Sequence, residues 1–292
     1  MVLYILLVLS IAFFAVFGFY RFVLKKPPVP PSSTGLSLYL FSELGQLPDA
    51  SPFCNKLEAF LRVANVPFEA IPLSRSLQVS APSGKRPFVS LNGEIIADSS
   101  VIIEKIQDRY QELMSAAGRP PALKPDTQGH FHLDASLNDA QRGISRAFCR
   151  MLQESTYWVV VHDRWVEDSN WVLYFPIIAS GIAIPSCFKW PLFNFIVRRS
   201  IRQTLWAQGT GRLPRARVYE DGSRDFQALS DLLGSDAFFF GQPFPTMLDI
   251  VAYSFVSAFS MAPFSSPVKE HLQAHCRNLV AHSQRLLEFQ NQ

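Results

Sequence analysis

Apolar and polar residues follow two different spacings after residue 35. The segment 36–41 alternates well enough to be a strand, whereas the next apolar positions recur at helical spacing: Cys54, Leu57, Phe60 and Leu61. Ser51 and Pro52 stand directly before this run. A serine hydroxyl can cap N–H groups at a helix start, and a proline there loses no hydrogen bond. The pattern therefore predicts a strand and then a helix that begins at Ser51.

Three further strands and a second helix are predicted up to about residue 111. The segments 66–71 and 86–91 have the composition of strands, and Asn92-Gly93 is a hairpin turn into a strand at 94–97. Asp98-Ser99-Ser100 is expected to cap a helix whose apolar positions share one side: Val101, Ile102, Ile106 and Tyr110. Two antiparallel strands thus follow an earlier strand–helix–strand unit.

The rest of the chain has the pattern of helices. A proline-rich linker at 120–125 precedes a helical stretch that runs through 146–165. Farther on, Thr246 and Asp249 form a capping box, in which each side chain satisfies the other residue's N–H. We interpret Asp249 as a structural residue for this reason.

The first twenty residues have the strongest apolar pattern. Val2–Tyr20 contains no charged side chain and would span roughly 28 Å as a helix, and three basic residues follow within six positions. A secretory signal would carry its positive charge before the apolar run, so an uncleaved anchor through residues 2–24 is favoured. Basic residues stay in the cytoplasm, which predicts a single-pass membrane protein with its globular part facing the cytosol. Residues 27–33 would form a stiff spacer at the end of this 1–35 segment.

A second apolar stretch, 171–197, is broken into pieces too short to span a membrane by proline and glycine: Pro176, Gly181, Pro185 and Pro191. We expect it to pack into the core. The alternative is contact with the membrane that the anchor holds nearby, because three arginines follow where anionic headgroups would lie: Arg198, Arg199 and Arg202.

Composition excludes several classes of protein. The chain has 292 residues, 48% hydrophobic and 17% charged, enough for a sizeable core and about two domains. A net charge of +3, without basic runs interleaved with aromatic residues, argues against nucleic-acid binding. Four scattered cysteines lack metal-ligand spacing, so neither a disulfide framework nor a metal site is indicated, and a reducing compartment fits best.

The order of these elements resembles the thioredoxin-like N-terminal domain of glutathione transferases. Four separated motifs resemble in particular the failed axon connections (Fax) and metaxin branch of that superfamily: Ser51–Cys54, Gly84–Phe88, Arg146–Trp158 and Gln208–Arg212. The resemblance covers about 36–287. It implies an α/β thioredoxin-like domain at 36–113 and an all-α glutathione-transferase-like C-terminal domain at 126–290, preceded by one transmembrane helix.

The resemblance also implies a glutathione site. In that family the proline at the position of Pro87 is cis, and the backbone of the residue before it, Arg86 here, pairs with the cysteinyl part of glutathione. The position of Asp98 and Ser99 holds the γ-glutamyl end, where a helix start offers N–H groups to a carboxylate and Asp98 can accept from an ammonium group.

Two residues at the first helix start are candidates for chemistry. By the same resemblance, Ser51 would hydrogen-bond and stabilise the glutathione thiolate. Cys54 is the alternative, since a helix N-terminus lowers the pKa of a nearby thiol. It would match the second cysteine of a glutaredoxin-like motif whose first cysteine is replaced by Ser51.

Two functions of different class stay open at this point. One is a membrane-anchored glutathione transferase that joins glutathione to an apolar electrophile. The other is a non-catalytic Fax- or metaxin-like scaffold that recruits a protein partner, or forms a homodimer, at a membrane.

Overall fold

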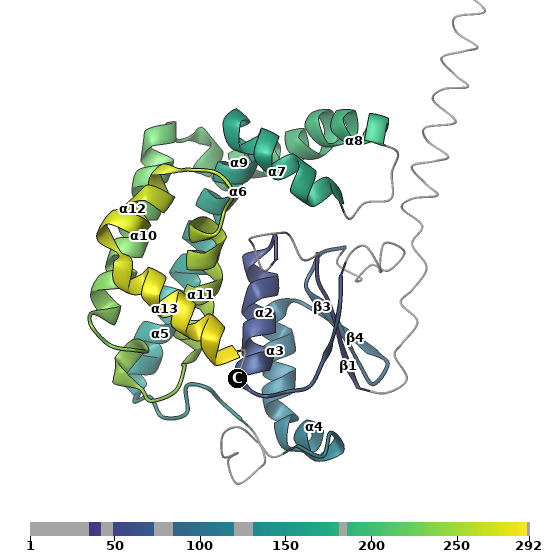
Figure 1. The fold of residues 1–292 in the computed structure, drawn as a ribbon, viewed down its shortest axis with the longest axis vertical. Helices are drawn as coiled ribbons and strands as arrows, with labels where there is room; N and C mark the ends of the chain where they lie inside the picture. Colours follow the sequence, from purple (N-terminus) through teal and green to yellow (C-terminus); the bar gives the residue numbers. More distant parts are fainter. Residues whose placement is uncertain (1–34, 42–48, 73–83, 120–130, 181–185, 291–292) are drawn as a thin grey trace, which may run out of the picture.

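A computed structural model describes residues 35–41, 49–72, 84–119, 131–180 and 186–290. Within these ranges, a small α/β domain stands beside a larger helical domain (Figure 1). The predicted membrane anchor, residues 2–24, lies outside them. Of the helices that are described, none has both the length and the apolar character needed to cross a membrane.

The α/β domain is built on a four-stranded mixed sheet. Its strands are β1 (Leu36–Tyr39), β2 (Glu69–Ile71), β3 (Phe88–Leu91) and β4 (Glu94–Ala97), in the order β2-β1-β3-β4. β1 runs parallel to β2 and antiparallel to β3, and β3 pairs antiparallel with β4. This is the predicted thioredoxin-like arrangement. Two strands start later than predicted, after Pro67 and Pro87, because proline has no N–H to donate to a sheet.

Helices of the α/β domain separate the sheet from the helical domain. They are α2 (Pro52–Val63), α3 (Ser99–Asp108) and the short α4 (Tyr110–Ala116). Figure 1 shows α2 and α3 together on one side of the sheet. The buried face of α3 differs slightly from the prediction, because Val101 is 43% exposed and Ile103 is buried. Ile102, Ile103 and Ile106 therefore form the buried stripe, at the spacing of one side of a helix.

The second domain is all-helical, as predicted. Its longer helices are α5 (Asp139–Met151), α6 (Tyr157–Trp165), α7 (Asp168–Ser180), α9 (Arg198–Gln208), α10 (Arg215–Leu233), α11 (Met247–Ser260), α12 (Pro267–His275) and α13 (Arg277–Gln290). The short α8 (Ser186–Pro191) and the irregular turns η2 (Leu152–Thr156), η3 (Leu192–Val197), η4 (Thr210–Arg212) and η5 (Phe239–Gly241) join them.

The central helix, α11, is buried along nearly its whole length and begins with the predicted capping box. Asp249 accepts a hydrogen bond from the N–H of Thr246 at 2.7 Å, and the Thr246 side chain caps Asp249 in return. The fully buried Asp249 also accepts from the N–H of Phe239 and lies 2.7 Å from Nε2 of His282 on α13. The carboxylate thus joins α11, η5 and α13, which supports its structural interpretation.

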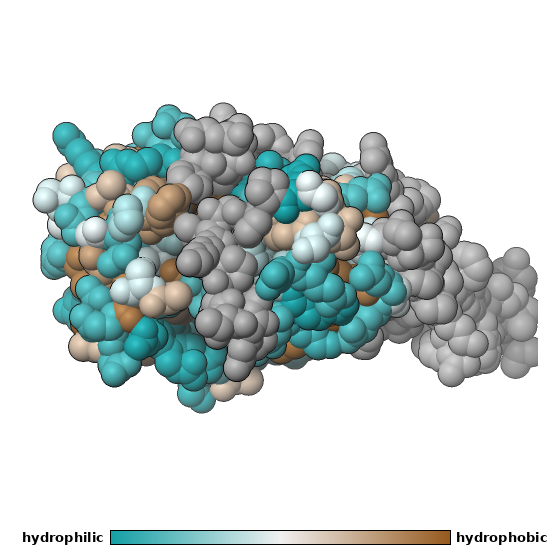
Figure 2. Space-filling view, turned by 90° about the horizontal axis from the view of Figure 1, so that it is seen from below, coloured by the Kyte–Doolittle hydropathy of each residue, from teal (hydrophilic) through white to brown (hydrophobic). Residues whose placement is uncertain are grey.

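The segment from α7 to α9 lies at one end of the molecule, away from the C-terminus (Figure 1). The expectation that 171–197 packs as core is right only in part. Trp171, Tyr174 and Phe193 are buried against Phe264, but several large apolar neighbours are exposed, among them Phe195 at 67%. The opposite end, seen from below in Figure 2, shows mostly hydrophilic side chains with scattered apolar ones.

Replacing Asp249 with alanine is expected to destabilise the fold. The change removes the cap of α11 and leaves the N–H of Phe239 and the ring of His282 buried without this partner, at a combined cost of about 3 kcal/mol or more. The melting temperature should fall by about 10 °C for a protein of this size. Thr246→Ser keeps the capping hydroxyl and should stay close to the parent. An unchanged melting temperature in Asp249→Ala would show that the carboxylate is not structural.

Candidate functional site

The start of α2 is held by Asp49, which the sequence analysis missed. Its Oδ1 accepts from the N–H of Ser51 at 2.8 Å, and its Oδ2 accepts from the N–H of Phe41 at 3.0 Å. In the described part of the chain the Ser51 hydroxyl makes no capping bond to the helix, contrary to expectation. An aspartate two residues before the N-cap is the signature of an Asx turn, and this signal was present in the sequence.

The thiol of Cys54 is buried beside this turn. It is within hydrogen-bonding reach of both the Ser51 hydroxyl and the Asp49 carboxyl. Burial raises the pKa of Cys54 well above its ordinary value, and burial also raises the pKa of Asp49 to about 7. A thiol held in its protonated form is a poor nucleophile. The geometry therefore favours Ser51 over Cys54 as the residue that would meet a ligand thiol.

The peptide bond between Arg86 and Pro87 is cis, as the resemblance implies. Pro87 is buried, and the guanidinium of the partly buried Arg86 lies over the Phe88 ring, 5.4 Å from its centre. Arg86 is also within electrostatic reach of Cys54 and Asp49. The start of β3 thus places a positive charge close to the start of α2.

Asp98 caps α3 at the position predicted for the γ-glutamyl end of the ligand. Its backbone has φ +73°, and its Oδ1 accepts from the N–H groups of Ser100 at 2.8 Å and Val101 at 3.3 Å. Asp98 is exposed, whereas the next residue, Ser99, is buried. The carboxylate is therefore fixed in orientation by the helix start while it stays accessible to solvent.

Lys56 was considered from the sequence as a cation near Cys54 that faces solvent, and the second part of that expectation is wrong. A lysine on a helix is ordinarily exposed, but Lys56 is only 1% exposed. Its ammonium group donates to Ser100 Oγ at 3.2 Å and to Gln153 Oε1 at 3.3 Å. The spacing of residues in α2 could have predicted this burial. Lys56 lies one turn after Pro52 and one turn before Phe60, both on the buried side of the helix.

Lys56 has no carboxylate within 4.0 Å among the described residues. Burial lowers its pKa to about 8, and the charge of Asp98 opposes that change. Both hydrogen-bond partners are neutral, so the positive charge is only partly compensated. The start of α3 consequently has an accessible carboxylate and a buried cation close to each other.

The helical domain fixes the loop that enters this site. Arg164 of α6 is 3% exposed and donates from Nη1 to the carbonyl of Ala50, directly before Ser51. Its Nη2 donates to the carbonyl of Ala258 in α11 at 2.8 Å. The same guanidinium lies over the ring of Tyr174 at 5.3 Å. The position of Ser51 therefore depends on both domains.

The described residues thus bring together all six predicted positions in one region. Ser51 and Cys54 share the start of α2, Arg86 and Pro87 lie at the start of β3, and the helix start after β4 supplies the last two, Asp98 and Ser99. The arrangement has cations and a carboxylate at its margin and a hydroxyl near its centre.

Two family models match the chain. The "Glutathione S-transferase N-terminal domain" model matches residues 52–121 and 122–170, and the "Glutathione S-transferase, C-terminal domain" model matches 222–286. The human glutathione transferase theta-2 structure, a complex with glutathione, has a TM-score of 0.51 and 17% identity, covering 88% of this chain and 82% of that one. This structural likeness supports the fold.

Curated relatives come from two functional classes. Failed axon connections of Drosophila melanogaster is 28% identical over 85% of this chain, which spans only 56% of that relative's length. Isoprene-epoxide–glutathione S-transferase of Rhodococcus sp. strain AD45 is 28% identical, covering 70% of this chain and 79% of the relative, and mouse metaxin-2 is 22% identical, covering 77% and 80%. The chain belongs to the glutathione S-transferase-like superfamily, and it is similar to failed axon connections and to the metaxins.

Proposed function

We propose that this protein binds glutathione at the starts of α2 and α3 and joins its thiol to an apolar electrophile. The observation that carries the proposal is that the buried ammonium of Lys56 donates to Ser100, two residues after the accessible carboxylate of Asp98, which acts on it electrostatically. The γ-glutamyl end of glutathione is an α-amino acid, with an ammonium and a carboxylate on one carbon. Asp98 would accept from the ammonium, and Lys56 would attract the carboxylate.

Ser51 and Arg86 would serve the other end of the ligand. The hydroxyl of Ser51 would donate to the thiolate sulfur and favour its charged form, while the backbone of Arg86 would hold the cysteinyl unit. The thiol proton would pass to solvent, and the thiolate sulfur would then form a bond to an electrophilic carbon while the bond from that carbon to its leaving group breaks, the leaving group departing into solvent with the electron pair. The family relationship and the glutathione transferase among the curated relatives support this proposal.

The proposal includes a membrane location. The apolar segment 2–24 would anchor the chain once through a bilayer, and the basic residues after it would keep the globular part in the cytosol. An apolar electrophile dissolved in that bilayer would be available at high local concentration. A protease assay tests this placement. It measures whether added protease digests the globular part in sealed vesicles whose outward face is known.

A scaffold without catalysis is the second candidate function, and one observation favours it. Lys56 already donates to Gln153 of the helical domain, and Phe53 packs against Tyr157 and Phe255 at ring distances of 5.0 and 6.1 Å. These contacts close the two domains on each other beside α2. Such a closed interface suits a non-catalytic scaffold, and metaxin-2 is among the proteins to which the chain is similar.

The whole chain is expected to bind glutathione. Lys56→Gln should raise the Kd about 10-fold or more, because the ligand loses an interaction with a charged group. Asp98→Asn should weaken binding similarly while preserving the helix cap. Calorimetry measures both effects. Lys105→Gln removes a partly exposed lysine of α3 that pairs with Glu94, away from the proposed site, and as the control it should bind normally. No heat and no thermal shift at millimolar glutathione would disprove glutathione binding.

Binding is also expected to take up protons near pH 8. The pKa of Lys56 is lowered to about 8 in the free protein, and a bound carboxylate would raise it by favouring the ammonium form. Affinity should therefore fall as the pH rises above about 8. Calorimetry with S-methylglutathione in buffers of different ionisation enthalpy measures this uptake without interference from the thiol. Lys56→Arg, which stays charged, should show less uptake, and equal uptake would contradict the role of Lys56.

Ser51→Ala separates the transferase from the scaffold. If Ser51 stabilises the thiolate, its removal should raise the pKa of bound glutathione by about one unit, seen in the ultraviolet absorbance of the thiolate, and should lower conjugation of a model electrophile about 10-fold. Glutathione affinity should change little. Binding without any conjugation in the parent protein would establish the scaffold, and an unchanged thiol pKa in Ser51→Ala would remove the role given to Ser51 alone.

A further inference from the structure

Exposed apolar side chains are concentrated in one part of the helical domain. Of the eleven large apolar side chains that are exposed in the described part of the chain, eight lie between residues 172 and 213. They are Val172, Leu173, Phe188, Trp190, Phe195, Ile196, Trp206 and Leu213, with exposed fractions from 42% to 67%. Single exposed apolar residues are ordinary, but a concentration of this kind marks a contact surface.

The exposed side of α7 is entirely apolar over its central turns. Val172, Leu173 and Pro176 are exposed and Ile177 is partly buried, at the spacing of one side of a helix. The other side of α7 packs into the domain through the buried Trp171 and its neighbours. The helix thus buries one apolar side and presents a second one, where solvent-exposed helices ordinarily carry polar residues.

The run from α8 through η3 to α9 continues this surface. Phe188, Phe195, Arg199 and Trp206 follow at intervals of seven, four and seven residues, and all four are exposed. Along the chain, Phe188 and Phe195 precede Arg199, and Trp206 follows it. We call the exposed residues of α7 and of the run 186–208 the α7–α9 face.

The charge of this segment is one-sided. Residues 169–219 contain seven lysines and arginines and no aspartate or glutamate. The whole chain has a net charge of only +3, so the remainder is net negative. Large apolar side chains interleaved with arginines complement a layer that is apolar inside and anionic outside, and the one exposed carboxylate of α7, Asp168, is paired with Arg198 and Arg202.

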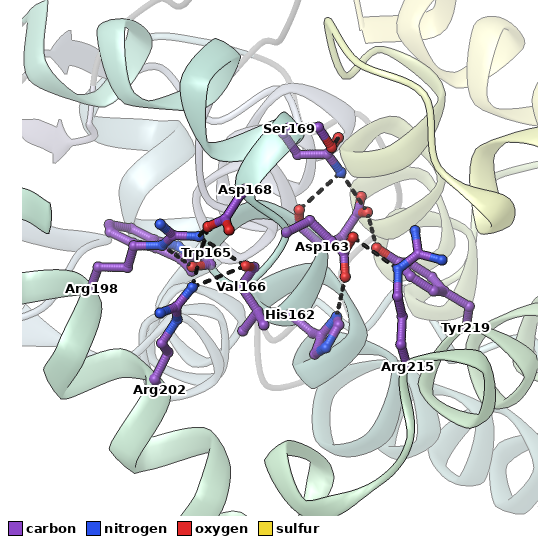
Figure 3. A network of polar contacts seen from close by, with 12 residues as sticks. His162, Asp163, Trp165, Val166, Asp168, Ser169, Arg198, Arg202, Arg215 and Tyr219 are labelled. Carbon is purple, nitrogen blue, oxygen red and sulfur yellow. Dashed lines mark hydrogen bonds and ion pairs between the residues drawn. The ribbon is translucent and has the colours of Figure 1, made fainter.

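The corner between α6 and α7 holds this face in place (Figure 3). Arg198 of α9 donates from Nε to the carbonyl of Trp165 at 2.6 Å and from Nη2 to the carbonyl of Val166 at 2.8 Å. It also pairs with Asp168 at 2.5 Å. Since Arg198 is itself buried, these bonds fix α9 against the start of α7.

A second set of contacts closes the same corner from α10. Arg215 pairs with Glu167 at 2.9 Å, and Tyr219 donates to Asp163 at 2.8 Å (Figure 3). Arg198 and Arg202 thus compensate the charge of the exposed Asp168, and Arg215 compensates that of the partly buried Glu167. The exposed arginines of the α7–α9 face are Arg199, two residues after η3, and Arg202, which pairs with Asp168 at 3.4 Å.

We propose that the α7–α9 face docks onto a lipid bilayer with anionic headgroups, inserting its apolar side chains to a shallow depth. No described helix could cross a bilayer, so the face would lie on the membrane, with aromatic rings at the interface and Arg199 among the phosphates. Aliphatic Val172, Leu173 and Ile196 cannot stack on bases, which argues against a nucleic acid as the anion. This docking is independent of the glutathione proposal.

Cys187 allows the docking to be measured on the whole chain. It is the exposed cysteine of α8, whereas Cys54, Cys149 and Cys276 are buried, so a nitroxide can be attached to it selectively. The labelled protein is mixed with phosphatidylcholine vesicles that contain or lack phosphatidylserine. Relaxation of the label by oxygen and by a water-soluble nickel complex reports its depth. We expect a membrane-embedded label with phosphatidylserine and a mostly aqueous one without it.

Three variants make this test specific. Phe195→Glu combined with Ile196→Glu should return the label to water, and Arg199→Gln should lower the ratio of docked to undocked protein about fivefold. Ile144→Glu, at an apolar site on α5 that is 40% exposed, is the control and should dock normally. All three replace exposed side chains, and equal melting temperatures confirm that they fold.

Three outcomes would overturn the proposal. The label could stay aqueous with both kinds of vesicle, or reach the same depth with and without phosphatidylserine, which would remove the role of the arginine. It could also lose mobility without lipid as the protein concentration rises. That last result would assign the α7–α9 face to a contact between proteins.

Discussion

The site depends on one buried cation, the guanidinium of Arg164. It donates to the carbonyl of Ala50 in the α/β domain and to that of Ala258 in α11, while the ring of Tyr174 covers it. A buried arginine is tolerated only where its donors are satisfied, so either domain alone would leave this charge without half of its partners. The orientation of the loop before Ser51 is therefore a property of the assembled protein.

The proposed ligand site contains charges that are only partly compensated. Asp49 is buried with two backbone donors, and Lys56 is buried with two neutral acceptors. Burial disfavours the charged form of each group. It therefore raises the pKa of Asp49 and lowers the pKa of Lys56. A charged ligand that completed these partial networks would gain more from them than from groups already surrounded by water. The buried charges of Asp49 and Lys56 distinguish this region from an ordinary interface between domains.

The sequence predicted what depends on local pattern. The hairpin at Asn92-Gly93, the cap at Asp98 and the box of Thr246 and Asp249 were all found, because each rests on residues a few positions apart. Long-range contacts were not visible in that way. The burial of Lys56 depends on Gln153, which is 97 positions away. The apolar residues of 171–197 were assigned to the core for a similar reason, since hydropathy alone does not say which side of a helix finds a neighbour.

The uneven distribution of charge along the chain has an electrical consequence. Seven basic residues and no acidic ones fall in 169–219, at one end of the molecule, while the remainder is net negative (Figure 1). A body charged in this way has a permanent dipole moment and experiences a torque in any external field. Near a negatively charged surface it would turn its α7–α9 end inward within a Debye length, about 8 Å at physiological salt, before any atom touches. Orientation would then precede contact, and rising salt would weaken it.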